Sequence, residues 1–237
     1  MDIRELDNPA WAALNGRHAH LAQGEGAVKR YPADVSPFSA IAEDAGLPAL
    51  AEAMTPGDNA VIWATDEHDA PDGLELVVRF PCLQMVAFDA RPIDTPDDAE
   101  AMTAADAPAM QALAVLTKPG PFGLRTIEMG SYVGVRHGRE IVAMAGERMK
   151  PDRFTEVSAI CVHPDHQGKG HARRLTSIMM KRVLADGRVP FLNVLPDNRP
   201  AIALYESLGF APRRLMQVHL FSKPGGDGSN DPYFRSL

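Results

Sequence analysis

One short segment, residues 162–172 (VHPDHQGKGHA), constrains the fold of this chain most strongly. It lies between a strand-like apolar run at 155–162 and a helix-like run at 171–185. A glycine-bearing loop that leads directly into a helix is a ready anion site, because glycine lets a ligand approach the backbone and the first N–H groups of a helix have no intrahelical partner. The segment by itself is equally compatible with an ordinary turn between a strand and a helix in an α/β domain.

A second motif follows downstream of this loop. Residues 191–195 form a short apolar strand that contains Asn193. The next residues predict a helix that begins after Asn198, a good N-cap, and ends at Gly209, a good C-cap. Two linked motifs, separated by elements of suitable length, are a much stronger signal than a lone pair of glycines.

Together the two motifs closely resemble the GNAT superfamily of acyl-CoA-dependent N-acyltransferases. The family's pyrophosphate loop has Gln or Arg, any two residues, Gly, any residue, and then Gly or Ala, a pattern that Gln167, Gly170 and Ala172 match. The resemblance covers roughly residues 97–222 and is sharpest from 155 to 211. It implies an α/β fold with a mixed sheet, and acetyl-CoA as cosubstrate with no metal.

The resemblance also implies which groups bind the coenzyme. Backbone N–H groups of the loop would hold the pyrophosphate, and those of the preceding strand would hold the pantetheine arm and the thioester oxygen. Irregular strand geometry would expose such donors. Two asparagine side chains would bind the pantetheine amides, although Asn198 also fits a role as helix cap alone. The candidates are Ile160, Cys161, Val162, Gln167, Gly168, Lys169, Gly170, His171, Ala172, Asn193 and Asn198.

Two residues are candidates for catalysis. Acyl transfer from a thioester to an amine needs a proton acceptor and a proton donor, but direct attack needs no nucleophilic side chain. Glu156 is the carboxylate on the strand at 155–162; alternation places it on one face with Ser158 and Ile160, where apolar neighbours would favour proton acceptance near neutral pH. Tyr205 stands where the family has a tyrosine that can protonate the thiolate. A solvated carboxylate and a core tyrosine are the plainer interpretations.

The cysteines and histidines predict no further chemistry. Cys82 and Cys161 are too few for a disulfide framework or a metal cluster, and the strand position of Cys161 favours packing over nucleophilic catalysis. The eight histidines show no metal-ligand spacing. The N-terminus lacks a signal-peptide core and no apolar run approaches the length of a membrane span, so a reduced, cytoplasmic location is expected, with no membrane partner.

The charges divide unevenly along the chain. Residues 1–117 carry 6 Lys/Arg against 20 Asp/Glu, a net charge of −14, whereas residues 118–237 carry 18 against 11, a net charge of +7. The acidic first half argues against a nucleic-acid partner, and the basic second half suits an anionic ligand such as coenzyme A. The asymmetry also fits two halves that simply attract each other. Candidates for the ribose phosphate are Lys169, Arg173, Arg174 and Arg199.

We expect two units joined by a linker at residues 89–98, which are rich in proline and aspartate. The first unit, residues 1–90, is an α/β unit that resembles a degenerate GNAT-like copy. It has no Gln-x-x-Gly-x-Ala motif, so we expect no second coenzyme site there, but a structural role or a lid. The GNAT domain spans residues 97–222, and residues 223–237 form a tail.

Local patterns predict further elements around the motifs. In the first unit they predict helices at 38–45 and 48–53, and strands at 60–64, 74–80 and 83–88, with Pro81 between the last two strands. In the second unit, Thr103 and Asp106 are capping candidates for a helix that ends near residue 116. The Pro-Gly-Pro turn that follows, within 118–123, is either substrate-facing or only a rigid turn.

These observations predict an N-acetyltransferase that moves an acetyl group from acetyl-CoA to the amine of a small molecule or a peptide by direct attack. A homodimer is compatible with the sequence. The alternative is a non-catalytic acyl-CoA-binding or sensing module. The joint presence of Glu156 and Tyr205 favours the enzyme.

Overall fold

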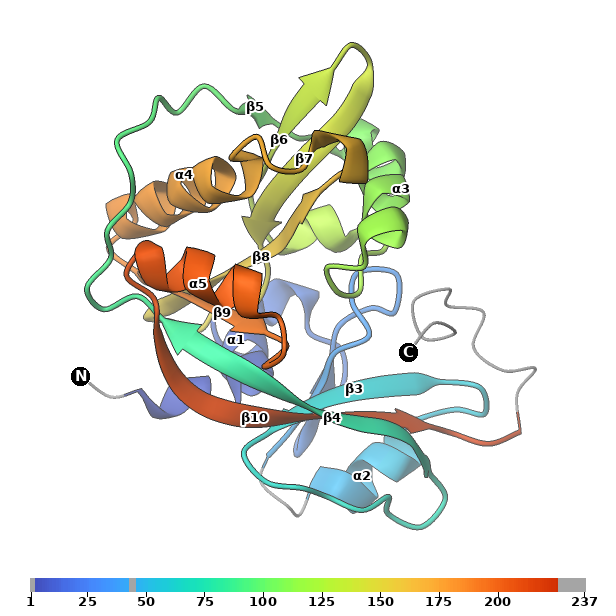
Figure 1. Cartoon of the computed structure of the whole chain (residues 1–237). Helices are drawn as coiled ribbons and strands as arrows, with labels where there is room; N and C mark the ends of the chain where they lie inside the picture. The colour runs from blue at the N-terminus through green and yellow to red at the C-terminus, as the bar shows by residue number, and fades with distance from the viewer. Residues whose placement is uncertain (1–2, 43–45, 226–237) are drawn as a thin grey trace.

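One mixed sheet of eight strands organises the chain in the computed structural model, which describes residues 3–42 and 46–225 (Figure 1). Its strands are β3 (Asn59–Ala64), β4 (Glu75–Val86), β5 (Glu100–Ala101), β6 (Tyr132–His137), β7 (Glu140–Glu147), β8 (Phe154–Val162), β9 (Val189–Val194) and β10 (Ala211–Ser222). Their order is β3-β10-β4-β9-β8-β7-β6-β5, and only β8 and β9 are parallel neighbours. The predicted α/β class with a mixed sheet is confirmed.

Helices cover both faces of this sheet. α3 packs on one face of β7 and β8, and α4 packs on the opposite face, so each buries a separate apolar cluster (Figure 1). None of the helices in the described ranges is long and apolar enough to cross a membrane. The α-helices are α1 (Pro9–Asn15), α2 (Gly46–Ala53), α3 (Ala107–Thr117), α4 (His171–Ala185) and α5 (Arg199–Ser207). Short 3₁₀ segments are η1 (Arg4–Leu6), η2 (Ala19–Leu21), η3 (Ala104–Asp106), η4 (Thr126–Met129) and η5 (Pro164–His166).

β4 is one long strand from the first 90 residues, and it lies between β9 and β10 of the second half. The predicted break at Pro81 is wrong. β9 pairs only with the end of β4, from Leu83 to Val86, so at Pro81 the strand has β10 as its single neighbour and the missing N–H can be tolerated. The division into two units stays a prediction, but the first of them shares its sheet with the second.

The predicted helix at residues 38–45 is also wrong where the structure describes it. Its first residues form β2 (Ser39–Ile41), which pairs antiparallel with β1 (Val28–Arg30) in a small separate sheet. Residues 43–45 lie outside the described part of the chain. Pairing with a distant segment here overrides a weak local helical pattern.

β8 and β9 form a wedge. They pair only from Phe154 to Glu156 and from Val189 to Phe191, and then they separate. β8 also contains a bulge: Ala159 has φ 51°, and the register with β7 shifts between Met144 and Gly146. The expected irregular strand is therefore present, and the unpaired edge of β8 beyond Glu156 opens into the wedge.

The bulge overturns the simple alternation expected for β8. Val157 packs in the cluster on the α4 side, whereas Ala159 and Cys161 pack in the cluster on the α3 side. Simple alternation would place all three residues on one face. A single extra residue in a strand exchanges the faces of every residue beyond it.

The expected linker, residues 89–98, lies along α4, and ion pairs and a hydrogen bond connect the two. Asp97 forms an ion pair of 2.7 Å with Arg182, and Asp98 forms an ion pair with Arg174. Lys181 Nζ donates a hydrogen bond of 2.9 Å to the carbonyl oxygen of Thr95. Part of the charge asymmetry thus serves contact between the two halves, and Arg174 already has a carboxylate partner.

Candidate active site

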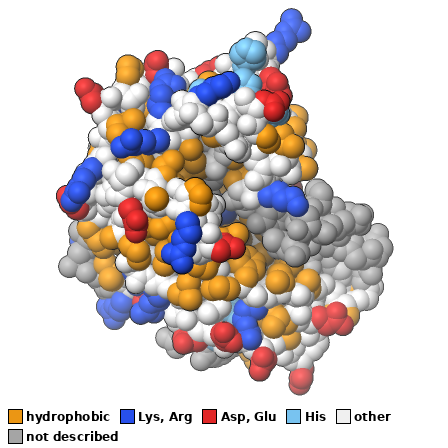
Figure 2. Space-filling model, in the orientation of Figure 1, with side chains coloured by type: hydrophobic (Ala, Val, Ile, Leu, Met, Phe, Trp, Pro, Cys, Tyr) orange, Lys and Arg blue, Asp and Glu red, His pale blue; other side chains and the backbone are white. Residues whose placement is uncertain are grey.

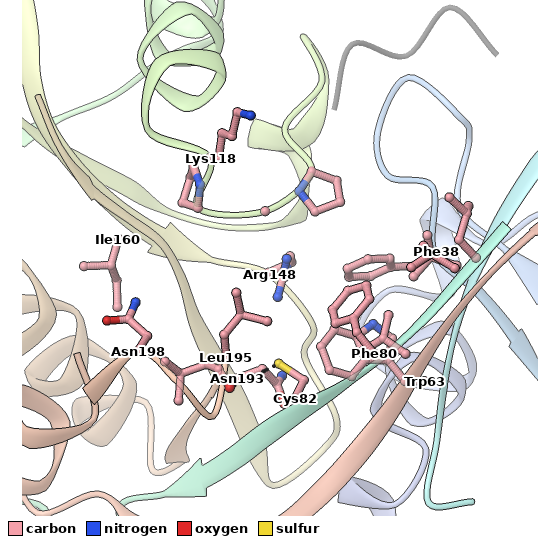
Figure 3. A pocket seen from close by; sticks show the side chains of 18 of the residues that line it. Phe38, Trp63, Phe80, Cys82, Lys118, Arg148, Ile160, Asn193, Leu195 and Asn198 are labelled. Carbon is pink, nitrogen blue, oxygen red and sulfur yellow. Dashed lines mark hydrogen bonds between the residues drawn. The ribbon is translucent and has the colours of Figure 1, made fainter. Parts of the chain in front are cut away.

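A pocket of about 410 Å³ lies in the wedge (Figure 3). Ile160 of β8 forms one side of it, and Asn193 of β9 forms the next. Strands β3, β4 and β10 form the opposite wall, and the loop after α3, from Lys118 to Pro121, covers it. The Pro-Gly-Pro turn, expected to be either substrate-facing or only a rigid turn, lies in this loop and lines the pocket. Hydrophobic side chains gather over β4 on the face of the molecule seen in Figure 2.

The structure brings four of the predicted residues to this one place. Ile160, Asn193, Asn198 and Tyr205 all line the pocket, although they come from two strands and from α5 with its cap. Asn198 has both of the roles considered for it: its Oδ1 accepts from the N–H of Ala201 at 3.2 Å, which caps α5, and the residue also faces the pocket.

Glu156 lies at the centre of a buried polar network beside the pocket. Arg148 donates from Nε to Oε2 at 2.9 Å and from Nη2 to Oε1 at 2.7 Å. The N–H of Met149 donates to Oε2 at 3.1 Å, and Asn193 Nδ2 donates to Oε1 at 2.8 Å. The carboxylate is completely buried, so these four hydrogen bonds replace the ones that an exposed carboxylate makes to water.

The expected apolar surroundings of Glu156 are therefore wrong. Arg148 and two further donors, the N–H of Met149 and Nδ2 of Asn193, surround the carboxylate, and charge-assisted bonds of the Arg148 kind are the strong ones. Glu156 is not among the residues that line the pocket, and it reaches the pocket only through Arg148 and Asn193. Its role as general base stays a prediction, and Arg148 and Asn193, not Glu156, are the members of this network that line the pocket.

The network also fixes the amide of Asn193. Because the carboxylate of Glu156 can only accept, the atom 2.8 Å from it is Nδ2. Oδ1 then has no donor among the described residues. A hydrogen-bond acceptor that is held in place and unpaired beside the pocket suits a ligand N–H.

Tyr205 lies at the wedge on α5 and is almost fully buried. Burial raises the pKa of its phenol to about 12. Its ring packs edge-on against Phe210 at 6.0 Å between centroids. Tyr205 thus keeps its proton at any ordinary pH, as a donor to a departing thiolate must.

Both cysteines are buried thiols in the structure. Burial raises the pKa of Cys161 to about 11 and that of Cys82 to about 12. Cys161 packs under α3, and Cys82 donates from Sγ to the carbonyl oxygen of Val194 at 3.4 Å. Neither thiol is in the ionised form that a nucleophilic cysteine needs. This favours direct attack.

The predicted pyrophosphate loop leads directly into α4. Gly168 and Gly170 have φ of 73° and 79°, and Gly170 is the N-cap of the helix. Gln167, Gly168, Lys169 and Gly170 are exposed, and the first turn of α4 carries no acidic residue. The N–H groups of this turn are therefore available to an anion.

We expect Gly170→Val to weaken binding of coenzyme A by well over tenfold. A Cβ at Gly170 would meet no atom within 4 Å in the chain itself, so the added side chain would instead obstruct the bound phosphate. Isothermal titration calorimetry measures the affinity, and the parent chain should bind one coenzyme A per chain.

Gly187 is the matched control for this change. It has φ of 70°, and a Cβ there also meets nothing within 4 Å, but it follows the other end of α4, about 22 Å away by helix rise. Gly187→Val carries the same backbone strain and should bind normally. Equal affinities of the two variants, or two sites per chain, would contradict the assignment.

No sequence pattern indicates the opposite wall of the pocket. Phe38 lies just before β2, Trp63 lies on β3 and Phe80 lies on β4, all within the first 90 residues. Arg148 lies over the ring of Phe38, 4.9 Å from its centroid. No motif marks these residues, because only the insertion of β4 beside β9 brings them to the wedge.

Comparison with known proteins agrees with this geometry. The FR47-like protein family matches residues 132–218. A crystal structure from Novosphingobium aromaticivorans DSM 12444, described as an acetyltransferase from the GNAT family, is 35% identical and covers 93% of this chain and 99% of its own, with a TM-score of 0.88. A GCN5-related N-acetyltransferase from Kribbella flavida shares the fold, with a TM-score of 0.59 at 20% identity over 92% of this chain and 95% of its own.

Two curated relatives match about a third of this chain. N-alpha-acetyltransferase RimI from Mycobacterium tuberculosis is 42% identical over 83 residues, which are 33% of this chain and 51% of the relative. Mycothiol acetyltransferase from Thermomonospora curvata is 39% identical over 83 residues, 34% of this chain and 27% of the relative. The chain thus spans about half, or less, of the curated relatives it matches.

The wedge, the bulged strand and the glycine loop before α4 define an acyl-CoA-dependent acyltransferase fold. Because the Novosphingobium protein is similar over nearly the whole length of both chains, this chain belongs to the GNAT family.

Proposed function

We propose that this protein is an N-acetyltransferase that transfers the acetyl group of acetyl-CoA to a primary amine by direct attack. The proposal rests on the pocket in the wedge. Ile160 of the bulged strand, Asn193 and Tyr205 all line this pocket. The names of the relatives, N-alpha-acetyltransferase and mycothiol acetyltransferase, support acetyl transfer to an amine.

The coenzyme would lie along the wedge. The N–H groups of residues 167–172 would bind the pyrophosphate, and those of Ile160, Cys161 and Val162 would bind the pantetheine arm and polarise the thioester carbonyl. Lys169, Arg173 and Arg199 remain candidates for the ribose phosphate. Asn198 would bind the pantetheine with the part of its amide that does not cap α5.

The chemical step forms one bond and breaks another. The amine nitrogen bonds to the thioester carbonyl carbon, and the C–S bond breaks to release coenzyme A as a thiolate. Tyr205 donates the proton that the thiolate receives and regains a proton from solvent. The amine loses a proton; its N–H would donate a hydrogen bond to Asn193 Oδ1, which has no donor among the described residues and is held in orientation by Glu156. Asn193 orients the amine but does not itself take the proton, which leaves to solvent.

A thiol-release assay tests this function. The chain is incubated with acetyl-CoA and, separately, with single amines, amino acid amides, peptides and aminoglycosides, and free coenzyme A is measured. We expect release that depends on one class of acceptor. Tight binding of acetyl-CoA without release in the presence of any acceptor would instead identify a binding module. A cytoplasmic location and a homodimer stay predictions.

A further inference from the structure

We infer that the acceptor is an α-amine on a carbon that carries an aromatic or large branched apolar side chain, which lies against the wall formed by Phe38, Trp63 and Phe80. This inference rests on the proposed function and names the substrate class of the same pocket. Two independent features of the pocket support it, the composition of its wall and the absence of acidic side chains.

The wall opposite the wedge is apolar and aromatic throughout. Phe38 and Trp63 pack edge-on with ring centroids 5.8 Å apart, and Phe80 and Val78 are only partly buried because they border the pocket (Figure 3). Val218 and Leu220 of β10 continue the same surface. A wall of this kind stabilises a bound apolar group by removing it from water; among the described residues its unpaired polar atom is Trp63 Nε1, a single donor.

The charges at the pocket do not favour a polycationic acceptor. Among the described residues that line it there is no aspartate or glutamate, and the charged ones are Lys118 and Arg148. Glu156 is the nearest carboxylate in the network, and Arg148 already neutralises it. A polyamine or an aminoglycoside would therefore place its positive charges against an apolar wall and two cations.

The lack of a carboxylate among the described lining residues also favours an α-amine over a lysine ε-amine as the acceptor. Because none of the described residues that line the pocket is a carboxylate that could deprotonate the acceptor, the amine must arrive neutral. An α-amine with a pKa of about 7.7–8.0 is roughly a third neutral at pH 7.5, whereas a lysine ε-amine with a pKa of about 10.4 is only about 0.1% neutral. The pocket is therefore suited to an α-amine by a factor of roughly 10² in available reactant.

The first experiment compares acceptors at pH 7.5 by the kcat/KM of thiol release. The series is the amides of glycine, alanine, leucine, phenylalanine and tryptophan, with α-acetyl-lysine amide as the ε-amine and spermidine as the polyamine. We expect phenylalanine or leucine amide to exceed glycine amide and the ε-amine by roughly 10²-fold, since hydrophobic pockets discriminate by about 10–200-fold per methylene. Free phenylalanine and a phenylalanyl tripeptide then show whether the α-amine belongs to an amino acid or to a chain.

The second experiment fills the pocket from its wall. Val78→Trp narrows the space beside Phe80, so it should lower the kcat/KM for phenylalanine amide at least tenfold relative to that for glycine amide. Val77→Trp is the matched control, because Val77 is the neighbour on β4, is 54% exposed and does not line the pocket. The ratio of the two acceptors does not depend on how much of each variant is folded.

Three results would overturn the inference: glycine amide as the best acceptor, the ε-amine or spermidine as the best acceptor, or an equal acceptor ratio in Val78→Trp and the parent chain. Failure of the proposed function looks different, because then no acceptor in the series releases coenzyme A at all.

Discussion

Tyr205→Phe is expected to slow acetyl transfer by roughly 10²–10⁴-fold, the usual contribution of a general acid. The change removes only the phenolic oxygen, so the ring still packs against Phe210 and coenzyme A should bind as in the parent chain. Because burial raises the pKa of Tyr205 to about 12, the phenol is protonated throughout an ordinary assay. The loss of rate should therefore be the same from pH 6 to pH 10.

A second tyrosine provides the matched control. Tyr132 is also buried, and its hydroxyl has no hydrogen-bond partner in the described ranges, but it packs under α3 and does not line the pocket in the wedge. Tyr132→Phe should keep full activity, since an unpaired buried hydroxyl contributes nothing favourable. A Tyr205→Phe variant as active as Tyr132→Phe would mean that the thiolate is protonated by another group.

Glu156→Gln is expected to destabilise the fold as well as to slow turnover. Each oxygen of Glu156 accepts two hydrogen bonds. In either orientation of a glutamine amide, its N–H₂ group would therefore face two donors and lose both hydrogen bonds. Breaking a buried ion pair from one side costs about 3–5 kcal/mol. For a chain of this size that cost lowers the melting temperature by roughly 10 °C, which differential scanning fluorimetry can measure.

A double-mutant cycle separates the ion pair from the rest of the site. Arg148→Met leaves the carboxylate without its cation and should also be strongly destabilising, while the Arg148→Met, Glu156→Gln double variant should lose less than the two single losses added together. Strict additivity would contradict the network.

The pH profile of Glu156→Gln decides between the two roles of this residue. If Glu156 only holds Arg148 and Asn193 in place, the loss of kcat is constant between pH 7 and pH 9.5. We expect this result because both oxygens of Glu156 already accept two hydrogen bonds each within the protein. If Glu156 is the general base, the loss shrinks as pH rises, because a neutral amine needs the base less. The measurement uses one good acceptor at saturating acetyl-CoA.

The parts of the fold that local sequence encodes were predicted well. α4 begins after Gly170 and ends at Ala185 as expected, and the capping box of Thr103 and Asp106 forms as its spacing predicts. Asn198 caps α5. These features depend on backbone groups and side chains only a few residues apart, so short sequence motifs are sufficient to predict them.

The parts that depend on distant pairing were not predictable in this way. The bulge at Ala159 changes the faces of β8, and it arises between β8 and β7 rather than within one strand. The network of Glu156 forms because Arg148 and Asn193 come from the end of β7 and from β9. The same holds for the aromatic wall, which exists only because β4 enters the sheet between β9 and β10.

Direct transfer of an acetyl group from acetyl-CoA to an amine in the wedge pocket can be followed with a label. The most direct test is to incubate the chain with acetyl-CoA labelled in its acetyl group and with phenylalanine amide, and to analyse both the small molecule and the protein by mass spectrometry. We predict labelled N-acetyl-phenylalanine amide, an equal amount of free coenzyme A, and no label on the protein. Free coenzyme A without a labelled amide, or label that accumulates on the protein in place of the amide, would contradict direct transfer to an amine.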